Sequence, residues 1–502
     1  SSKSIFLIKI SPSRPYIIIE LYTFNSIIVW NTILEVNKMP INSYEDYPIT
    51  WRPDKTKLTR PIYKSLIQQL EEDILTSKLQ KNTQLPSQRE LADYLDINFT
   101  TVGQAYKYGI EKGLLYTNIG SGTFVSPNAF TSITISTNQV AEHVIDFGLV
   151  SSFEDCNHLV LPFIHSVSLN PNIVGLLNYR DPMGTNFQLK TAVEWLQTQG
   201  VQTTIHHTAI VSGVQNGLAV TLAAFFSPGD RIAIDRYTYS NFIELAHLYH
   251  LEVVPIDFDQ EGMKPELLLQ ECHKKKIKGI YLMPSCNNPI GFQLSLQRRN
   301  ELKAIISKEK LLVIEDDIHS FLTTHFQQQV LPPFQQLLPD QTIYLSGMTK
   351  FICSGLRVAY LVFPERLRER IERAIFNINV KTSGLDAEII TQILHSPETV
   401  QKILTTKLKR TAEANDCFDA YFDFPRPSNP YPYYRNIPIR ADISPLDVEQ
   451  HFLNKGIRIY HSNRFTSQQQ ADPFIRIALS SNHLEILKKG LRIIKEEIDA
   501  YL

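Results

Sequence analysis

The sequence predicts two folded domains of different class: a small domain of three helices and a β-hairpin, then a large α/β domain with a mainly parallel sheet and a small C-terminal lobe. Three observations predict this. The chain has 502 residues, more than one domain usually contains. Residues 51–126 combine apolar residues at helical spacing with a glycine-rich turn. From residue 144 to 502, apolar strand-like runs alternate with helical patterns.

Composition places few limits on the partners of the chain. Hydrophobic residues make up 43% of the sequence, enough for a large core, and the formal net charge is −1. Overall charge therefore indicates neither nucleic acid nor membrane, and a DNA-binding face would have to be local. The five cysteines form no close Cys-x-x-Cys pair and are odd in number, which fits reduced thiols in a cytoplasmic protein. The sequence shows no metal-ligand spacing, so no metal is expected.

Residues 1–50 are predicted to be an N-terminal extension whose role the sequence leaves open. The apolar run 17–36 is about as long as a membrane span. Four polar or charged residues that are costly in hydrocarbon interrupt it, namely Glu20, Asn25, Asn31 and Glu35. A cleavage site typical of secretory signals does not follow. We therefore expect no membrane span, and we expect residues 1–38 to add nothing to function.

The first helix of the small domain is predicted to begin at Pro61, a residue that suits the first position of a helix. Apolar residues recur there at helical spacing: Ile62, Leu66, Leu70 and Ile74. Ser87 and Glu90 form a capping box that starts a second helix ending at Leu95.

A third helix is predicted to begin near Thr100, with Val102, Ala105, Tyr106 and Ile110 on its inward face. The run 114–125 then predicts a two-stranded hairpin that turns at Gly120, Ser121 and Gly122. Three helices and a hairpin make a winged helix-turn-helix.

Residues 57–126 resemble the GntR-type DNA-binding domain, through the Leu-Pro-Ser-x-Arg start of the second helix and the Gly-Ser-Gly-Thr-Phe-Val wing. The resemblance implies that Arg89, Thr101 and the wing around Gly122 approach DNA, with the third helix in the major groove. Phe99 stands where the family commonly has an arginine. Nine lysines and arginines face eight aspartates and glutamates between Pro53 and Ser126, so the electrostatic contribution is expected to be small. A winged helix used only for protein contacts is the alternative.

Residues 127–143 are polar, lack sustained periodicity and predict a linker before the α/β domain of residues 144–502. Within that domain, Lys350 lies between an apolar run and the strand-like Val-Ala-Tyr-Leu-Val. Burial between strands disfavours the charged form of a lysine and makes its neutral amine available as a nucleophile that forms a Schiff base. A surface lysine in a loop is the alternative for this residue taken alone.

Three motifs in chain order resemble fold type I, pyridoxal-phosphate-dependent aminotransferases: Asn-Pro-x-Gly at Asn288, an aspartate after an apolar strand at Asp316, and Lys350 followed by Arg357. The resemblance implies that Lys350 is the catalytic, Schiff-base lysine and that Asp316 pairs with the pyridine nitrogen. It also implies that Asn288 binds the 3-oxygen of the ring and Arg357 the phosphate. Asp317 competes with Asp316, and the family's pattern favours Asp316.

Other segments match the same pattern. Gly213, Val214 and Gln215 begin an apolar helix after a strand, where backbone N–H groups favour a phosphate. By resemblance, the ring of Tyr239 stacks on the pyridine and Tyr179 reaches the phosphate of the partner subunit. Each tyrosine alone would more simply be a core or rim residue.

Arg476 lies in an apolar strand near the C-terminus, where an unpaired charge is expensive and a ligand carboxylate is an obvious partner. The matching arginine of the family clamps the carboxylate of the substrate. A structural salt bridge is the alternative.

A GntR-type domain joined to an aminotransferase-like domain is similar to the MocR subfamily of bacterial transcription regulators. This resemblance implies bound pyridoxal 5'-phosphate, a head-to-tail homodimer, a double-stranded DNA operator, and an amino compound or a B6 vitamer as effector. An active aminotransferase with a DNA-binding appendage is the alternative, and a pseudoenzyme dimer that senses no ligand is a third possibility.

Weak transaminase turnover is expected from one departure from the family. Aminotransferases have a tyrosine two or three residues after the ring aspartate, whose hydroxyl helps hold the 3-oxygen. Ile318 and His319 occupy those places here. Isoleucine donates no hydrogen bond, and the sequence leaves open whether His319 replaces the hydroxyl or faces solvent.

Overall fold

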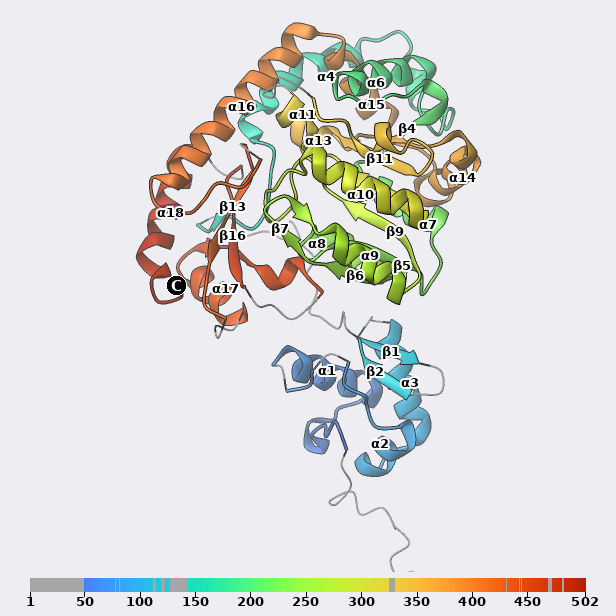
Figure 1. Ribbon diagram of the computed structural model, residues 1–502, viewed down its shortest axis with the longest axis vertical. Helices are drawn as coiled ribbons and strands as arrows, with labels where there is room; N and C mark the ends of the chain where they lie inside the picture. The colour runs from blue at the N-terminus through green and yellow to red at the C-terminus, as the bar shows by residue number, and fades with distance from the viewer. Residues whose placement is uncertain are drawn as a thin grey trace, which may run out of the picture. The chain divides into compact units, whose positions relative to one another are not determined.

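The computed structural model describes residues 49–502 apart from 77, 81, 112–113, 119–121, 127–142, 325–329, 430, 442, 444, 468–471 and 481–482. The chain divides into two compact units, the first ending at Val125 and the second beginning at Ser126 (Figure 1). The extension predicted for residues 1–50 and the linker predicted for 127–143 lie almost wholly outside the described residues.

The smaller unit is a winged helix-turn-helix, as predicted. Its elements are α1 (Ile62–Leu75), α2 (Gln88–Leu95), α3 (Phe99–Glu111), β1 (Leu115–Asn118) and β2 (Gly122–Val125), preceded by the short η1 (Lys55–Lys57). Ser87 and Glu90 form the predicted capping box at the start of α2. The expectation for Pro61 was wrong by one position: it is the residue before α1, and its extended backbone precedes the first helical residue.

Apolar side chains from all three helices form the core of this unit. Leu66, Leu91, Val102 and Ala105 are buried. Tyr106 is buried too, and its hydroxyl donates to the carbonyl of Pro86 at 2.7 Å. The antiparallel hairpin of β1 and β2 receives a third segment at its edge, since the N–H groups of Asn82 and Leu85 bond to β2 carbonyls. The wing is therefore fixed to the turn that precedes α2.

A seven-stranded sheet in the order β4-β12-β11-β10-β9-β5-β6 organises the larger unit. Its strands are β4 (Thr208–Val211), β5 (Arg231–Asp235), β6 (Glu252–Ile256), β9 (Ile277–Leu282), β10 (Leu312–Asp316), β11 (Thr342–Gly347) and β12 (Ala359–Val362). β12 runs antiparallel to both neighbours, and the other pairs are parallel. Parallel strands end at the same edge, so Asp235, Asp316 and the Lys350 segment that follows β11 come together there.

Helices cover this sheet and bury its apolar faces. They are η2 (Glu154–Val160), α4 (Leu161–Ser168), α5 (Ile173–Leu176), α6 (Asn186–Thr198), η3 (Ile205–His207), α7 (Val214–Phe225), α8 (Ser240–Leu248), α9 (Pro265–Lys274), α10 (Leu296–Glu309), α11 (Ser320–Thr324), α12 (Phe334–Leu337), α13 (Met348–Phe351), η4 (Glu365–Leu367), α14 (Arg368–Asn379) and α15 (Gly384–Leu394). α9 packs on β6 and on α10, and α7 packs on α8 and α14 (Figure 1).

A smaller lobe is built from the C-terminal part of the chain. The long helix α16 (Pro397–Asp419) leads from the large sheet to it (Figure 1). The lobe contains β13 (Tyr434–Pro438), α17 (Pro445–Asn454), β14 (Ile457–Arg458), β15 (Tyr460–His461), η5 (Ser462–Phe465), β16 (Phe474–Ala478) and α18 (Leu484–Ile498). β13, β16 and β15 form an antiparallel sheet. The short strand β3 (Ile145–Asp146), from the start of the unit, pairs with β14.

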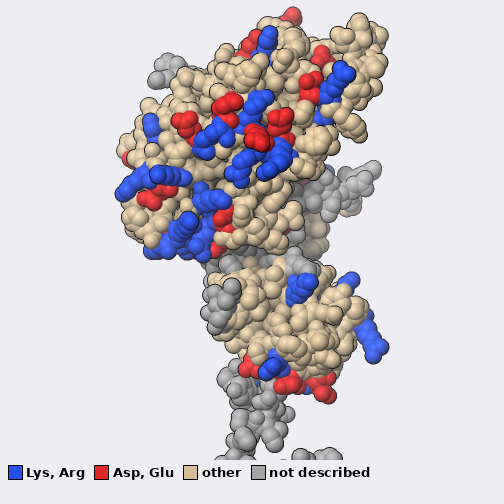
Figure 2. Space-filling model, turned by 90° about the vertical axis from the view of Figure 1, so that its right-hand side faces the viewer, with Lys and Arg blue, Asp and Glu red and all other residues tan. Residues whose placement is uncertain are grey.

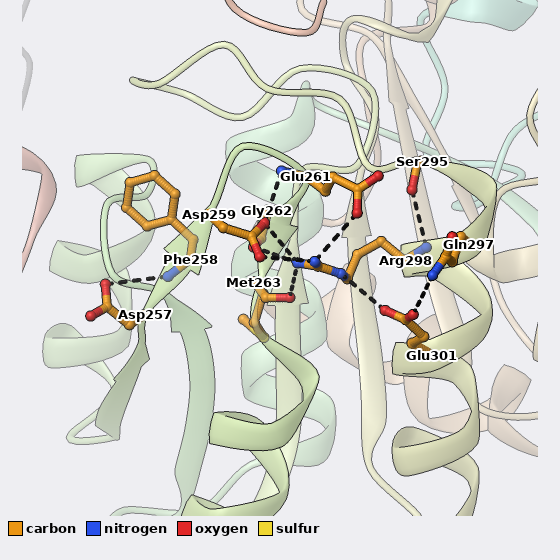
Figure 3. A network of polar contacts seen from close by, with 10 residues as sticks. All are labelled: Asp257, Phe258, Asp259, Glu261, Gly262, Met263, Ser295, Gln297, Arg298 and Glu301. Carbon is orange, nitrogen blue, oxygen red and sulfur yellow. Dashed lines mark hydrogen bonds and ion pairs between the residues drawn. The ribbon is translucent and has the colours of Figure 1, made fainter.

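A buried arginine fixes a small hairpin to the side of the large sheet. Arg298, at the start of α10, binds Asp259 at 3.0 Å and the carbonyls of Gly262 and Met263 at 2.8 and 2.9 Å (Figure 3). These residues belong to the hairpin of β7 (Phe258–Asp259) and β8 (Gly262–Met263). The hairpin carries a phenylalanine whose ring centroid is 6.0 Å from that of Tyr237, in the loop that follows β5.

Charged side chains on the face of the larger unit in Figure 2 are of both signs and lie intermixed. Several lysines of this unit are paired with carboxylates, for example Lys278 with Asp230 at 2.6 Å and Lys274 with Glu271 at 2.9 Å. No described helix combines the length and the apolarity that crossing a membrane requires.

Candidate functional site

The amine of Lys350 is held at the edge of the large sheet where the parallel strands end. α13, which carries it, begins directly after β11. The Nζ atom donates to the carbonyl of Val150 and, at 3.5 Å, to that of Ser151. Burial lowers the pKa of Lys350 to about 7, and the charges of Lys407, Arg476 and Arg357 act in the same direction. A large share of the Lys350 amine is therefore neutral at neutral pH, as a nucleophilic lysine requires.

Asp316 is the last residue of β10, and only one oxygen of its buried carboxylate has a side-chain hydrogen-bond partner among the described residues. The hydroxyl of Tyr281 donates to its Oδ2 at 2.8 Å, while Oδ1 has no partner among the described residues. Burial raises the pKa of Asp316 to about 7, although the bond from Tyr281 opposes the shift. The ring of Tyr281 stacks on Phe242 with centroids 3.7 Å apart, which fixes the hydroxyl in place. A cationic N–H group would satisfy Oδ1 and favour the charged carboxylate.

Asp317 points to different partners. The hydroxyl of Tyr344 donates to its Oδ2 at 3.4 Å, and Ser285 and the charge of Arg299 further favour its charged form, against burial. Asp317 is thus part of the support beneath the site. Oδ1 of Asp317, like Oδ1 of Asp316, has no partner among the described residues, so this atom does not distinguish the two carboxylates. The charge of Asp316 acts on Tyr239, the residue expected to cover the ring, and this favours Asp316 as the ring partner.

A guanidinium and a helix N-terminus lie together beside Lys350. Gly213 precedes α7 with a φ of 82°, a left-handed conformation that favours glycine. A Cβ atom at Gly213 would lie 2.6 Å from Nη2 of Arg357, so the absence of a side chain leaves room for the guanidinium. Arg357 also donates to Thr349 at 3.3 Å. The N–H groups at the start of α7, from Val214 and Gln215, add a partial positive charge.

The two tyrosines differ in their surroundings. Tyr239 precedes α8, and its ring is close enough to Asp316, Arg357 and Arg476 for their charges to act on it. Burial raises the pKa of Tyr239 to about 12, so its hydroxyl stays protonated. Tyr179 lies between α5 and α6 and is 83% exposed. An exposed ring is compatible with reaching a second subunit, and the described chain gives Tyr179 no role in its own site.

Asn288 lies in the loop after β9, and its Oδ1 accepts a hydrogen bond from Nη1 of Arg476 at 3.0 Å. The preceding residue, Asn287, fixes this loop. Its Nδ2 donates to Asp235 at 3.2 Å and to the carbonyl of Tyr237 at 3.1 Å. The side-chain amide of Asn288 is therefore held at the same sheet edge as Asp316.

Arg476 lies in β16 with a fully buried side chain. Nη1 binds Asn288 and Nη2 donates to the carbonyl of Gly148, while Nε has no partner among the described residues. The guanidinium lies 4.6 Å from the ring of Phe465. Burial lowers the pKa of Arg476 to about 10, a value at which it remains charged at neutral pH. Among the described residues no carboxylate forms an ion pair with it, which argues against a structural salt bridge.

His319 is buried, and the possibility that it faces solvent was wrong. Its ring packs edge-on against Tyr433 with centroids 5.2 Å apart. Burial, reinforced by the charge of Lys350, lowers the pKa of His319 to about 3, so the ring is neutral at physiological pH. The side chain of Ile318 packs toward Gly347 and carries no polar atom.

Lys407 and Tyr281 are site residues that the sequence did not single out. Lys407, on α16, donates to the carbonyl of Lys350 at 3.1 Å and to that of Ile352 at 2.8 Å. It therefore fixes the turn that carries the nucleophilic lysine. Its position 57 residues later in the chain gives no sequence signal, and Tyr281 resembles any core tyrosine of a buried strand.

The residues expected to approach DNA lie on the smaller unit. Arg89 is exposed on α2, Thr101 is partly exposed on the first turn of α3, and Gly122 is exposed at the start of β2. Phe99 begins α3 and is 47% exposed. All four side chains or backbone positions are accessible for contact, and their roles in DNA binding remain predictions.

The residues of the larger unit fit pyridoxal phosphate. Oδ1 of Asp316 is a buried acceptor without a partner among the described residues, the space beside Gly213 admits a guanidinium, and Lys350 has a pKa that leaves an amine free to react. Each group matches one part of the cofactor. The amine suits its aldehyde, the carboxylate suits its pyridine nitrogen, and the arginine beside a helix N-terminus suits its phosphate.

Family models match both units. Residues 62–125 match bacterial regulatory proteins of the gntR family, and residues 172–488 match aminotransferase class I and II. The HTH-type transcriptional regulator YdeF of Bacillus subtilis is 32% identical over 92% of this chain and 99% of its own length. The HTH-type transcriptional regulator YjiR of Escherichia coli is 25% identical over 65% of this chain and 74% of its own.

Solved aminotransferase structures share the fold of the larger unit. An archaeal alanine:glyoxylate aminotransferase superposes with a TM-score of 0.67 at 16% identity, over 72% of this chain and 91% of that one. LysN, the α-aminoadipate aminotransferase of Thermus thermophilus, superposes with a TM-score of 0.65 at 17% identity, over 72% of this chain and 93% of that one. At this level of identity the likeness concerns the fold alone.

Proposed function

Because this chain belongs to the GntR-type bacterial regulators whose helix-turn-helix domain is joined to an aminotransferase class I and II domain, the MocR type, we propose that it is a cytoplasmic transcription regulator that binds pyridoxal phosphate. An amino compound or a B6 vitamer is the effector. The observation that carries the proposal is the site around Lys350, where a reactive amine, a buried carboxylate and an arginine beside a helix N-terminus lie together.

Each residue of the site has a defined task toward the cofactor. Lys350 would attach to it covalently, Asp316 would face its ring nitrogen, and Asn288 its 3-oxygen. Arg357 and the start of α7 would bind its phosphate, and Tyr239 would cover its ring. When bound, pyridoxal phosphate supplies a carbonyl that amines attack and a ring that accepts electrons.

Arg476 would bind the carboxylate of an amino-acid effector. Its Nε, which has no partner among the described residues, and the charge-assisted bonds available to a carboxylate make such a ligand favourable at this buried side chain. If the effector is a B6 vitamer instead, Arg476 has no carboxylate to bind. Comparison of the Arg476→Lys variant with the wild type, using amino acids and B6 vitamers in turn, separates these two effector classes.

The exposed apolar surface of the larger unit supports a homodimer. Large apolar side chains that are 44% to 83% exposed gather within residues 161–187, namely Leu161, Ile164, Leu169, Val174, Leu177, Tyr179 and Phe187. Soluble proteins rarely leave such a group uncovered, and a second copy is the partner that the proposal requires. Sedimentation of the Val174→Glu, Leu177→Glu double variant tests this, since a dimer would dissociate.

An active aminotransferase with a DNA-binding appendage is the second candidate, and the fold of the larger unit favours it over other enzymes. The regulator is preferred because Ile318 offers no hydroxyl and because His319 is neutral and has a pKa too low to act as an acid at neutral pH.

The proposal is tested by two measurements on the full-length protein. Pyridoxal phosphate should give a visible absorbance band that Lys350→Ala lacks. Selection of bound duplexes from fragmented genomic DNA should recover a discrete sequence in paired half-sites. A protein that binds the cofactor but recovers no sequence would support the enzyme instead.

A further inference from the structure

One short segment accepts hydrogen bonds from two basic side chains of the candidate site, Lys350 and Arg476. The segment is residues 148–152, here named the strap. Its carbonyls at Val150 and Ser151 accept hydrogen bonds from Nζ of Lys350, and its carbonyl at Gly148 accepts one from Nη2 of Arg476. The proposed cofactor amine and the proposed carboxylate receptor are therefore both bound to the same stretch of backbone.

The strap is fixed by its own side chains and by close packing. The hydroxyl of Ser151 donates to the carbonyl of Ser480 at 2.6 Å, and the hydroxyl of Ser480 returns a bond to the carbonyl of Ser151 at 3.0 Å. A Cβ atom at Gly148 would lie 2.8 Å from the ring of Tyr460, so the backbone there lies directly against that ring. The carbonyl of Gly148 thus has a defined position toward Arg476.

Both ligands of the site would compete with the strap. A neutral amine has two N–H donors and an ammonium group has three, and covalent attachment of the Lys350 nitrogen leaves at most one, so it can no longer serve both carbonyls. Nε and Nη2 form one edge of a guanidinium plane, the edge that binds a carboxylate bidentately. On Arg476 the Nε atom is without a partner among the described residues and Nη2 donates to Gly148, so a carboxylate that binds this edge competes with the Gly148 carbonyl for Nη2.

The strap lies close in sequence to β3, the first strand of the larger unit, which follows the segment that leads to it from the winged helix. β3 pairs with β14, and Asp146 of β3 binds Nε of Arg458 at 2.9 Å. Asp146 also accepts the N–H of Gly148 at 2.8 Å and that of Leu149 at 3.2 Å. A change in the conformation of the strap would therefore first alter these contacts of Asp146, at the start of the larger unit.

We propose that the strap is a ligand-responsive latch: it binds Lys350 and Arg476, and it is released when the cofactor and a carboxylate ligand take these two groups. The inference rests on the proposed function, because it assumes those ligands. Release of the strap loosens the Asp146 contacts and, through the connecting chain, alters DNA binding by the smaller unit.

Hydrogen–deuterium exchange of the full-length protein tests the latch with two probes, one that acts on Lys350 and one that acts on Arg476. Pyridoxal phosphate consumes the Lys350 amine. N-(5'-phosphopyridoxyl)-L-leucine cannot attach to Lys350 and carries a carboxylate for Arg476. Each should raise exchange in residues 144–153 about fivefold, the factor expected for one lost hydrogen bond. Unchanged or slower exchange there, with bound cofactor seen by absorbance, overturns the latch and leaves the cofactor proposal intact.

Serine variants separate the latch from general loosening. Ser151→Ala and, independently, Ser480→Ala remove the reciprocal bonds without changing the backbone carbonyls, and should raise exchange in residues 144–153 before any ligand is added. Ser462→Ala is the control, since its buried hydroxyl accepts the N–H of Phe474 at 3.0 Å in the same lobe. Without any ligand, the strap variants should bind the selected DNA duplex with the affinity that the wild type shows when the phosphopyridoxyl probe is bound. Variants that keep the affinity of the ligand-free wild type would contradict the coupling.

Discussion

The hydroxyl of Tyr281 donates to Oδ2 of Asp316 at 2.8 Å, whereas that of Tyr344 donates to the neighbouring Asp317 at 3.4 Å. Two adjacent carboxylates thus have separate tyrosine partners. This pairing allows the carboxylate that serves the cofactor ring to be identified by experiment.

Tyr281→Phe should weaken pyridoxal phosphate binding about fivefold. The hydroxyl favours the charged form of Asp316, and its loss removes a hydrogen bond of about 1 kcal/mol from the carboxylate that would face the ring nitrogen. Absorbance titration measures the change. Tyr344→Phe is the matched control and should leave the affinity nearly unchanged. A larger loss of affinity in Tyr344→Phe than in Tyr281→Phe would show that Asp317, and not Asp316, faces the ring nitrogen.

Capture of pyridoxal phosphate by the cofactor-free protein should become faster as pH rises through about 7. Burial and nearby cations lower the pKa of Lys350 to that value, so the reactive neutral amine dominates above pH 7 and the charged amine below it. Stopped-flow absorbance across the range measures the rate. A midpoint near the ordinary lysine pKa would mean that Lys350 is not desolvated.

Gly213→Ala should weaken cofactor binding about tenfold. The added methyl group would meet Arg357 and would also strain a left-handed backbone. Gly355→Ala is the control, because that glycine lies between Lys350 and Arg357 in the chain but its Cβ atom would meet open space. Equal losses in both variants would show that the loop, and not the position of Arg357, controls binding.

Arg89→Ala and Thr101→Val should each weaken binding of the selected duplex while the cofactor absorbance stays unchanged. Phe99→Arg should have the opposite effect, raising affinity and making it more salt-dependent, because it adds one cation at the start of α3. Gel-shift titrations at two salt concentrations measure both. If Phe99→Arg weakens binding, the phenylalanine itself contacts DNA.

Amino acids should shift the cofactor absorbance while yielding little keto acid over many hours. Ile318 and the neutral ring of His319 give poor support to the proton transfers of transamination. Coupled assays with several amino donors and keto acids measure the product. Steady multiple turnovers would establish the enzyme and reject the regulator as the sole function.

The helices, strands and motif order could be predicted because they depend on local patterns. Ser87 with Glu90 marks a helix start, and the apolar runs before Asp316 and Lys350 mark strand ends. The contacts that support the site depend on which strands become neighbours. Tyr281 reaches Asp316 because β9 lies beside β10, a pairing that one sequence does not reveal.

Residues that are distant along the chain were missed for the same reason. Lys407 reaches the carbonyl of Lys350 from α16, and the strap reaches Lys350 from 200 positions earlier in the sequence. His319 could be placed next to the aspartates, yet its burial against Tyr433 depends on the C-terminal lobe.

The pairing of β3 with β14 has a consequence for synthesis of the protein on the ribosome. Asp146 and Arg458 are 312 positions apart, so the strand that begins the larger unit has no partner until nearly the whole chain has emerged. The winged helix, whose contacts are local, can fold long before that point. A prematurely terminated chain would therefore display a folded winged helix without a folded aminotransferase-like domain.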